Sequence, residues 1–159
     1  MGGWEREAAR AEDLGIRTVL VRTGLVLARH DGVLKRMLPP FKLGLGGRIG
    51  NGRAWFSWVT LADTVRIFEY VAASDLRGPV NAAAPNPVTN ADFTRALGRA
   101  LHRPTLFPVP PLALKVMFGA EMANETVLAS QRVRPDRLLA AGFAFEHETV
   151  DEGLAAALA

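Results

Sequence analysis

The sequence has 159 residues, of which 49% are hydrophobic and 22% charged; this is enough for one domain with a buried core and excludes a disordered chain. It contains no cysteine, which excludes a disulfide scaffold and a thiolate metal site. The net charge of +3 comes from scattered arginines, a pattern typical of a solvated surface and not of a nucleic-acid-binding stripe. No apolar run approaches the roughly 18 residues of a membrane span, and the first residues do not resemble a signal peptide. We therefore expect a cytoplasmic protein without nucleic-acid or membrane partners.

The first part of the chain predicts a helix, a strand and a second helix. Apolar residues at helical spacing indicate a helix over 4–14. The β-branched run 18–22 is typical of a strand buried on both faces of a parallel sheet, and the apolar run 25–27 follows it directly. Asp31 can cap the next helix, which the proline pair at 39–40 should end or kink.

A glycine-dense loop over 44–52 is the first candidate site. It does not match the dinucleotide fingerprint G-x-G-x-x-G, because Ile49 stands where the third glycine should be and no strand precedes the loop. We interpret it as a flexible loop that lets the backbone approach a neighbouring segment closely.

An aromatic cluster follows the glycine loop. Alternation places Phe56 and Trp58 on one face and Trp55 and Ser57 on the other. Packing in the core and a position in an apolar pocket wall, with an indole N–H as a polar handle, both fit this pattern.

The remaining elements are helices and one more strand. Thr60 and Asp63 predict a capped helix through Ala73, and a second buried strand is expected over 80–83. The later helices are expected over 92–101, 112–118, 135–141 and 149–158. Their boundaries are indicated by the capping pair Thr89 and Asp92, by four prolines within 104–111 and by a glycine at 142.

This order predicts an α/β fold with a small parallel sheet that is part of a larger one. Strands 18–22 and 80–83 should be parallel neighbours, joined by a right-handed crossover that contains the helix over 61–73. The outer edge of strand 18–22 should be unpaired, and the apolar faces of helices 4–14 and 33–38 should be partly uncovered, which favours a homo-oligomer or dependence on a partner.

Few side chains point to catalysis. His30, His102 and His147 are far apart and form no zinc motif; His102 is expected at a helix end. Tyr70 is followed four places later by Ser74, so it does not form the Tyr-x-x-x-Lys pair of short-chain dehydrogenases, and we expect it to pack. Arg22 ends a strand where open α/β sheets bind ligands, and position alone fits a ligand contact and an ordinary surface arginine equally well.

The order of motifs resembles the C-terminal half of an extended short-chain dehydrogenase/reductase of the sugar-nucleotide epimerase type. More narrowly, it is similar to the subfamily whose C-terminal region is a domain of unknown function of the DUF1731 type. The resemblance covers essentially the whole chain, and it rests on the stretches Trp4–Glu5, Val21–Leu27, Met37–Gly47, Gly50–Arg53, Ser57–Val59, Asp63, Asn81–Asn90, Gln131–Val133 and Gly142–Phe143.

The resemblance implies a partial Rossmann-like parallel sheet, consisting of its outer strands only, with a mostly helical C-terminal substrate lobe. Residues 1–30 and 60–84 would form the sheet part, and residues 31–59 and 85–159 the substrate lobe. Arg22 would reach the cofactor from the strand end, with Thr23 and Gly24 beside its nicotinamide end.

The resemblance also implies candidate substrate contacts from Arg53, Trp55 and Trp58. The cofactor of the complete protein would be NAD or NADP, and the chain alone is expected to bind almost none, because the glycine fingerprint belongs to the other half.

We expect the C-terminal, substrate-lobe half of an NAD(P)-dependent epimerase or oxidoreductase, inactive by itself. Its partner would be an N-terminal half or a second copy of the chain. The alternative is a non-catalytic interaction module derived from the same fold.

Overall fold

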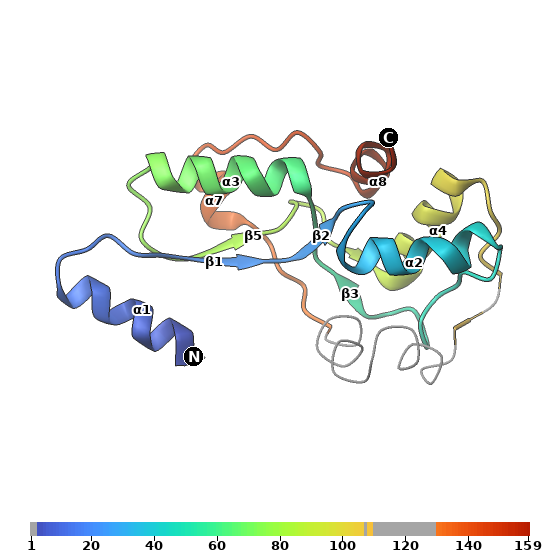
Figure 1. Cartoon of the computed structure of the whole chain (residues 1–159), viewed down its shortest axis with the longest axis horizontal. Helices are drawn as coiled ribbons and strands as arrows, with labels where there is room; N and C mark the ends of the chain where they lie inside the picture. The colour runs from blue at the N-terminus through green and yellow to red at the C-terminus, as the bar shows by residue number, and fades with distance from the viewer. Residues whose placement is uncertain (1–2, 107, 110–129) are drawn as a thin grey trace.

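The computed structural model describes residues 3–106, 108–109 and 130–159 (Figure 1). The helix expected over 112–118 lies outside these residues. The fold is mixed α/β, with these elements in chain order: α1 (Gly3–Asp13), β1 (Val19–Thr23), β2 (Leu25–Leu27), α2 (Gly32–Lys42), β3 (Trp55–Phe56), β4 (Trp58–Thr60), α3 (Leu61–Ala73), β5 (Gly78–Ala82), β6 (Val88–Thr89), α4 (Asn90–Leu101), α7 (Asp136–Ala140) and α8 (Val150–Leu158).

β1 and β5 form the parallel pair that the sequence predicts. Their register runs from Val19 opposite Gly78 to Thr23 opposite Ala82, and the connection between them contains α3. In Figure 1, α3 lies on one side of this pair and α1 on the other. Among the described residues β1 pairs with β5 alone, so its other edge is open.

The prediction that β1 is buried on both faces is wrong. Val19, Leu20 and Val21 are all only half-buried: Val19 and Val21 pack against Val80 and Ala82 in the core beneath α3, Leu20 belongs to neither core cluster, and Arg22 is exposed. Successive side chains of a strand point to opposite faces, so the face away from α3 is the one left open.

Two short pairings were not predicted. β2 lies parallel to β4, with Leu25 opposite Trp58, and β3 lies antiparallel to β6, with Trp55 opposite Thr89. β1 and β2 are separated only by Gly24, so one extended segment pairs first with β5 and then with β4.

α2 differs from the sequence prediction in two respects. The helix continues through the proline pair to Lys42, and the amides of Leu43 and Leu45 close its last turn by donating to the carbonyl oxygens of Pro39 and Pro40. Its apolar face is also not uncovered, because it packs toward β2 and α4 within the core. The expected cap is confirmed, since the Asp31 side chain accepts a hydrogen bond from the Gly32 amide.

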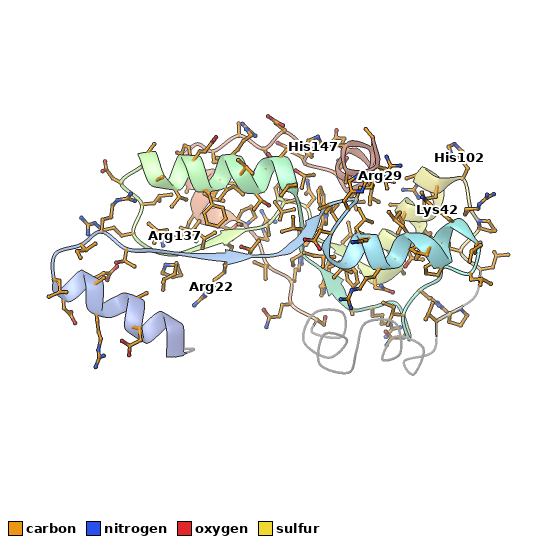
Figure 2. All side chains as sticks on the ribbon, viewed as in Figure 1. Arg22, Arg29, Lys42, His102, Arg137 and His147 are labelled. Carbon is orange, nitrogen blue, oxygen red and sulfur yellow. The ribbon has the colours of Figure 1, made fainter. Side chains whose placement is uncertain are left out.

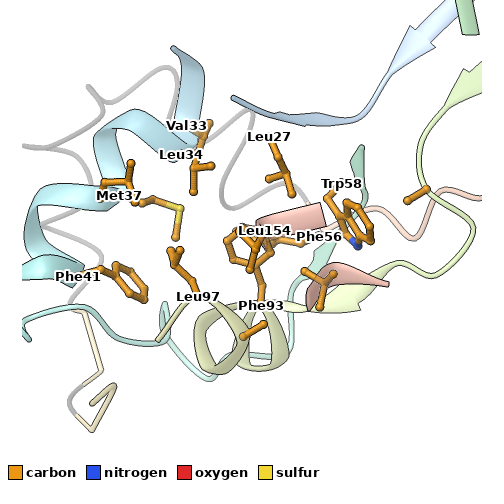
Figure 3. Packing of buried hydrophobic residues seen from close by; sticks show 14 of the residues in the cluster. Leu27, Val33, Leu34, Met37, Phe41, Phe56, Trp58, Phe93, Leu97 and Leu154 are labelled. Carbon is orange, nitrogen blue, oxygen red and sulfur yellow. The ribbon is translucent and has the colours of Figure 1, made fainter. Parts of the chain in front are cut away.

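The buried side chains form two clusters. The larger one joins α2, β3, β4, α4 and α8 and contains Leu34, Phe56, Trp58, Phe93 and Leu154 (Figure 3). The smaller one lies between α3 and the β1–β5 pair, and Leu138, Phe143 and Phe145 belong to it. Part of the segment expected in the substrate lobe therefore packs against the sheet.

A buried carboxylate connects α3 to the C-terminal segment. Asp63, which is 1% exposed, accepts hydrogen bonds from the backbone amides of Glu146 and His147 at 2.9 and 3.1 Å and from Arg66 Nη1 at 2.8 Å. At the other end of α3, the Arg17 guanidinium donates to the carbonyl oxygens of Val71, Ala72 and Leu76. Both ends of α3 are thus fixed by side chains. No helix in the described ranges is long and apolar enough to cross a membrane.

Candidate functional site

The candidate site begins at the carboxyl end of β1, where the strand changes its pairing partner. The Gly24 amide donates to the Ala82 carbonyl oxygen at 2.9 Å, whereas the next amide, that of Leu25, donates to the Ser57 carbonyl oxygen at 2.7 Å. Gly24 therefore lies at a junction of three segments. A Cβ atom at this position would lie 2.3 Å from the Ser57 oxygen, so the junction has no room for a side chain.

A cavity of about 450 Å³ lies on one side of this junction. Its wall is mainly apolar, with Val26, Val33 and Phe56, and Ser57 and Gln131 contribute polar groups. Trp55 also lines it, which places this predicted substrate residue at a cavity wall. The volume and the mixture of apolar surface with a few polar groups are typical of a small-molecule site.

A second cavity of about 480 Å³ shares Thr23 and Gly24 with the first. Its lining carries three guanidinium groups and one carboxylate, contributed by Arg22, Arg132, Arg134 and Asp136, together with the Asn81 amide. Arg134 Nε pairs with Asp136 Oδ1 at 3.1 Å. The charge in this cavity favours anionic ligands such as phosphate, which guanidinium groups bind with paired hydrogen bonds.

Arg22 projects from the end of β1 (Figure 2). Its residue is exposed, which fits both a ligand contact and an ordinary surface arginine, and Asn81 is its register neighbour on β5. The three predicted cofactor residues, Arg22, Thr23 and Gly24, therefore line one cavity together.

Gln131 and Val133 line both cavities, and Arg132 lines the second; this segment is held by Ser57, which lies between β3 and β4. The Ser57 hydroxyl donates to the Gln131 carbonyl oxygen at 2.7 Å and accepts from the Val133 amide at 2.9 Å. The Arg132 guanidinium lies 4.7 Å from the centroid of the Trp55 ring, a cation–π contact. Ser57 thus joins the two walls of the site.

The structure does not bring all predicted substrate residues together. Trp58 is fully buried, and its indole N–H donates to the Asn86 carbonyl oxygen at 3.1 Å. The sequence allowed the aromatic cluster either to pack in the core or to line a pocket. Trp58 packs in the core, and Trp55 lines a cavity. Arg53 is exposed on the glycine loop, where its amide donates to Asn51 Oδ1, and it is not in the lining of either cavity.

The other candidate groups have structural roles. Tyr70 packs edge-on against Phe143 at a centroid distance of 5.3 Å, and its hydroxyl donates to the Ala141 carbonyl oxygen, which confirms the packing interpretation. His102 ends α4 in the left-handed conformation, as expected for a helix end. The described residues contain no group of three or more potential metal ligands. Among the described residues lining the two cavities, none is a tyrosine, lysine or histidine.

Comparison with known proteins identifies the type of chain that forms this site. Residues 109–157 match the domain of unknown function DUF1731. "Epimerase family protein MT2273" of Mycobacterium tuberculosis is 47% identical over 152 residues, which are 95% of this chain and 50% of that protein. The human "Epimerase family protein SDR39U1" is 40% identical over 143 residues, covering 89% of this chain and 48% of that protein. The chain corresponds to the C-terminal half of an epimerase-family protein.

Solved structures place this epimerase-family chain among Rossmann-fold proteins. The human epimerase family protein SDR39U1, isoform 2, whose structure was determined with NADPH, matches with a TM-score of 0.80 and 36% identity over 88% of this chain and 48% of that one. The Thermus thermophilus UDP-glucose 4-epimerase, in complex with NAD, matches with a TM-score of 0.66 at 17% identity and covers 96% of this chain, which shows a shared fold. The chain spans about half the length of the relatives it matches.

Several lining residues of the epimerase-family chain were not predicted as site residues. Ser57, Asn81, Gln131 and Arg132 lie within stretches that carried the family resemblance, but neither periodicity nor spacing assigned them to a site. One sequence feature could have indicated this wall: Gln131–Val133 matches the family although the surrounding segment has no apolar periodicity, so packing alone does not explain the match.

Proposed function

We propose that this chain supplies the substrate-facing half of an NAD(P)-dependent epimerase or oxidoreductase. The observation that carries the proposal is the pair of cavities that meet at Thr23 and Gly24, at the carboxyl end of β1. In open α/β sheets, ligands bind in the crevice outside the carboxyl ends of the strands.

The donor set of the second cavity fits a nicotinamide dinucleotide. Arg22, Arg132 and Arg134 provide positive charge for phosphate oxygens, and the Thr23 hydroxyl and the Asn81 amide suit ribose and carboxamide groups. Bound NAD(P) would supply the hydride acceptor or donor. The chain's own residues would bind and orient the cofactor, with Arg22 on its phosphate or ribose oxygens and Thr23 and Gly24 beside its nicotinamide end.

The first cavity suits the substrate. Trp55, Val33 and Phe56 would exclude water from it, and the polar groups of Ser57 and Gln131 would orient polar groups of a small molecule. Arg53, which is exposed on the glycine loop and outside the described lining, would contact the substrate from the rim of this lobe. We assign the proton-transfer groups of the reaction to the complementary half. The described lining of these cavities offers no tyrosine, lysine or histidine, and its one carboxylate, Asp136, is paired with Arg134.

Calorimetric titration with NADPH tests the proposal. The chain alone should give no saturable heat at micromolar cofactor, since the pyrophosphate contacts of a glycine fingerprint come from the other half. A chimera in which the first half of Mycobacterium tuberculosis MT2273 precedes this chain should bind NADPH with micromolar affinity. Micromolar binding by the chain alone would show that the cofactor site is misplaced, and a folded chimera that binds neither NADH nor NADPH would refute the proposed function.

A non-catalytic interaction module is the second candidate. Exposed apolar side chains on α3 favour it, because such groups are typical of protein contacts. This candidate predicts a chimera that assembles stably and binds no NADPH.

A further inference from the structure

The loops that follow α2 and α4 carry three strongly exposed leucines. Both helices end at the same end of the molecule, away from α1 (Figure 1). Leu43 and Leu45 come directly after α2 and are 75% and 66% exposed, and Leu106, after α4, is 78% exposed. Single exposed leucines are common on protein surfaces, whereas a group of them marks an interaction site. We call these three residues the leucine tip.

Two hydrogen bonds place the leucines of the tip side by side. Arg103 Nε donates to the Lys42 carbonyl oxygen at 2.9 Å, and the Val109 amide donates to the Arg48 carbonyl oxygen at 2.8 Å. The segment 103–109 therefore runs along the segment 42–48. Leu106 lies midway between the two contacts, next to the turn that carries Leu43 and Leu45.

The turn after α2 is fixed to the core on one side only. A Cβ atom on Gly46 would lie 2.4 Å from Cγ of the buried Phe41, so the chain runs directly against this ring. A Cβ atom on Gly44 would meet nothing within 4 Å, so the chain stands away from the molecule there. The leucines on either side of Gly44 are thus held outward by a turn that is anchored at Gly46.

The exposed residues around the leucine tip include four basic ones: Lys42, Arg48, His102 and Arg103. Figure 2 shows Lys42 and His102 at the same end of the molecule. Neither residues 32–62 nor residues 93–109 contain an aspartate or a glutamate. The whole chain has 16 acidic residues, so these two stretches are a distinctly basic part of it.

A cavity of about 550 Å³ continues this basic surface along α4. Its described lining includes Arg95, Arg99, His102 and Arg103 and no carboxylate. Arg95 and Arg99 are each paired with an aspartate outside the lining. The hydrogen bond from Arg103 Nε goes to a carbonyl oxygen, which does not neutralise its charge. The cavity therefore suits a phosphate group, which guanidinium groups bind strongly.

We propose that the leucine tip and the basic residues around it bind the surface of a membrane that contains anionic phospholipids. The leucines enter the boundary between headgroups and acyl chains, and the basic groups contact lipid phosphates. A nucleic acid has the same negative charge but no apolar layer that would take up exposed leucines. A surface contact of this kind needs no membrane-spanning segment. It also does not depend on the proposed function, because the tip lies outside the described linings of both site cavities.

Sedimentation of the chain with vesicles tests the proposal. One set of vesicles is pure phosphatidylcholine, and the other contains about 30% phosphatidylserine, at an ionic strength of about 0.1 M. The apolar contribution is tested by a double variant, Leu43→Ser with Leu106→Ser. Its matched control is Leu14→Ser with Ile16→Ser, which changes residues that are 78% and 57% exposed beyond the end of α1.

The charge contribution is tested separately by Lys42→Gln. The exposed Arg77→Gln, at the start of the segment that leads into β5, is its matched control. Circular dichroism of each variant checks that it folds, and all four changes fall on exposed residues. A 20-base-pair DNA duplex of about the same charge density, in place of the vesicles, tests the nucleic-acid alternative.

We expect the chain to bind the phosphatidylserine vesicles at least about tenfold more tightly than the neutral ones, a difference worth about 1.4 kcal/mol. The double leucine variant should lose about tenfold in affinity, and Lys42→Gln about fivefold. Both controls should bind like the wild type. Equal binding to the two kinds of vesicle, or equal losses in the leucine variant and its control, would overturn the proposal. Tighter binding to the duplex than to the anionic vesicles would also overturn it, in favour of a nucleic-acid partner.

Discussion

Gly24 and Ser57 lie closer together than any side chain on Gly24 would permit. The Ser57 carbonyl oxygen accepts the Leu25 amide at 2.7 Å and would lie 2.3 Å from a Cβ atom on Gly24. The contact is with backbone, so no rotation of a side chain can relieve it. The pairing of β2 with β4 and the shape of both cavities therefore depend on a residue without a side chain.

The variant Gly24→Ala should lower the free energy of unfolding by about 3 kcal/mol, the upper part of the range for overpacking. Urea unfolding followed by circular dichroism measures the change. Gly15→Ala is the control, because its Cβ would meet nothing within 4 Å and only its positive φ of 77° adds a cost, of about 1 kcal/mol. Equal losses in the two variants would contradict the steric argument.

Removing the buried carboxylate of Asp63 should destabilise the chain strongly. Asp63→Ala leaves the amides of Glu146 and His147 without their acceptor and Arg66 without its buried partner, so we expect a loss of about 3–5 kcal/mol. Asp63→Asn, which keeps the size and one carbonyl acceptor, should lose less. The exposed Asp75→Ala is the control, and chemical unfolding is again the measurement. A loss below about 1 kcal/mol for Asp63→Ala would show that the C-terminal segment is held by other contacts.

The last helix should contribute a pH-dependent part of stability through Glu152. Hydrogen bonds from Thr149, first from its backbone amide, hold the pKa of the Glu152 carboxyl below its ordinary value of 4.5. A carboxyl whose pKa is lower in the folded state than in the unfolded state stabilises the chain at pH values above its unfolded-state pKa. This contribution is lost as the pH falls through its folded-state pKa. Glu152→Gln should therefore be less stable than the wild type at neutral pH, and the difference should shrink at an acidic pH below 4.5, where the carboxyl becomes protonated in the folded chain as well.

Urea unfolding at both pH values measures this difference. The control is Glu12→Gln, which removes one negative charge from an exposed position on α1. A stability gap for Glu152→Gln that stays the same at both pH values would contradict the capping argument.

Arg22 should matter for the cofactor and Arg53 should not. In the chimera, Arg22→Ala should weaken NADPH binding by about 1.5–3 kcal/mol, the range for a hydrogen bond to a charged group. Arg53→Ala, on the glycine loop and outside the lining of the second cavity, should change NADPH affinity much less. Isothermal titration of both variants gives the comparison. If neither substitution changes the affinity, Arg22 is an ordinary surface arginine.

Local signals in the sequence predicted the elements that are determined locally. Thr60, Thr89 and Thr149 each accept a hydrogen bond from the amide three residues later, as their spacing indicated. The pairing of β1 with β5 could also be predicted, because a β-branched apolar run is recognisable by itself and parallel neighbours need a crossover helix between them.

The remaining features depend on contacts between distant segments. β3 and β6 have two residues each, too few for a periodic pattern, and they become strands only by pairing with each other. The far wall of the site was missed for the same reason, since Ser130 and Gln131 contact β3 and Ser57 across about 75 residues of sequence. The sequence does not decide the role of Arg22, because it places this residue at the end of a strand without showing which side chains from other segments lie beside it.

Because β1 and β2 form one continuous segment, the register of the β1–β5 pair and the register of the β2–β4 pair are fixed together. Val21 faces the smaller core and Leu27 the larger, and both pairings lie on the same nine residues, 19–27. Inserting or deleting one residue within β1 would turn the side chains between that point and Gly24 to the opposite face of the sheet if the residues before it kept their positions. It would also move Gly24 away from Ser57. Evolution can therefore vary the length of the surrounding loops far more freely than the length of this segment.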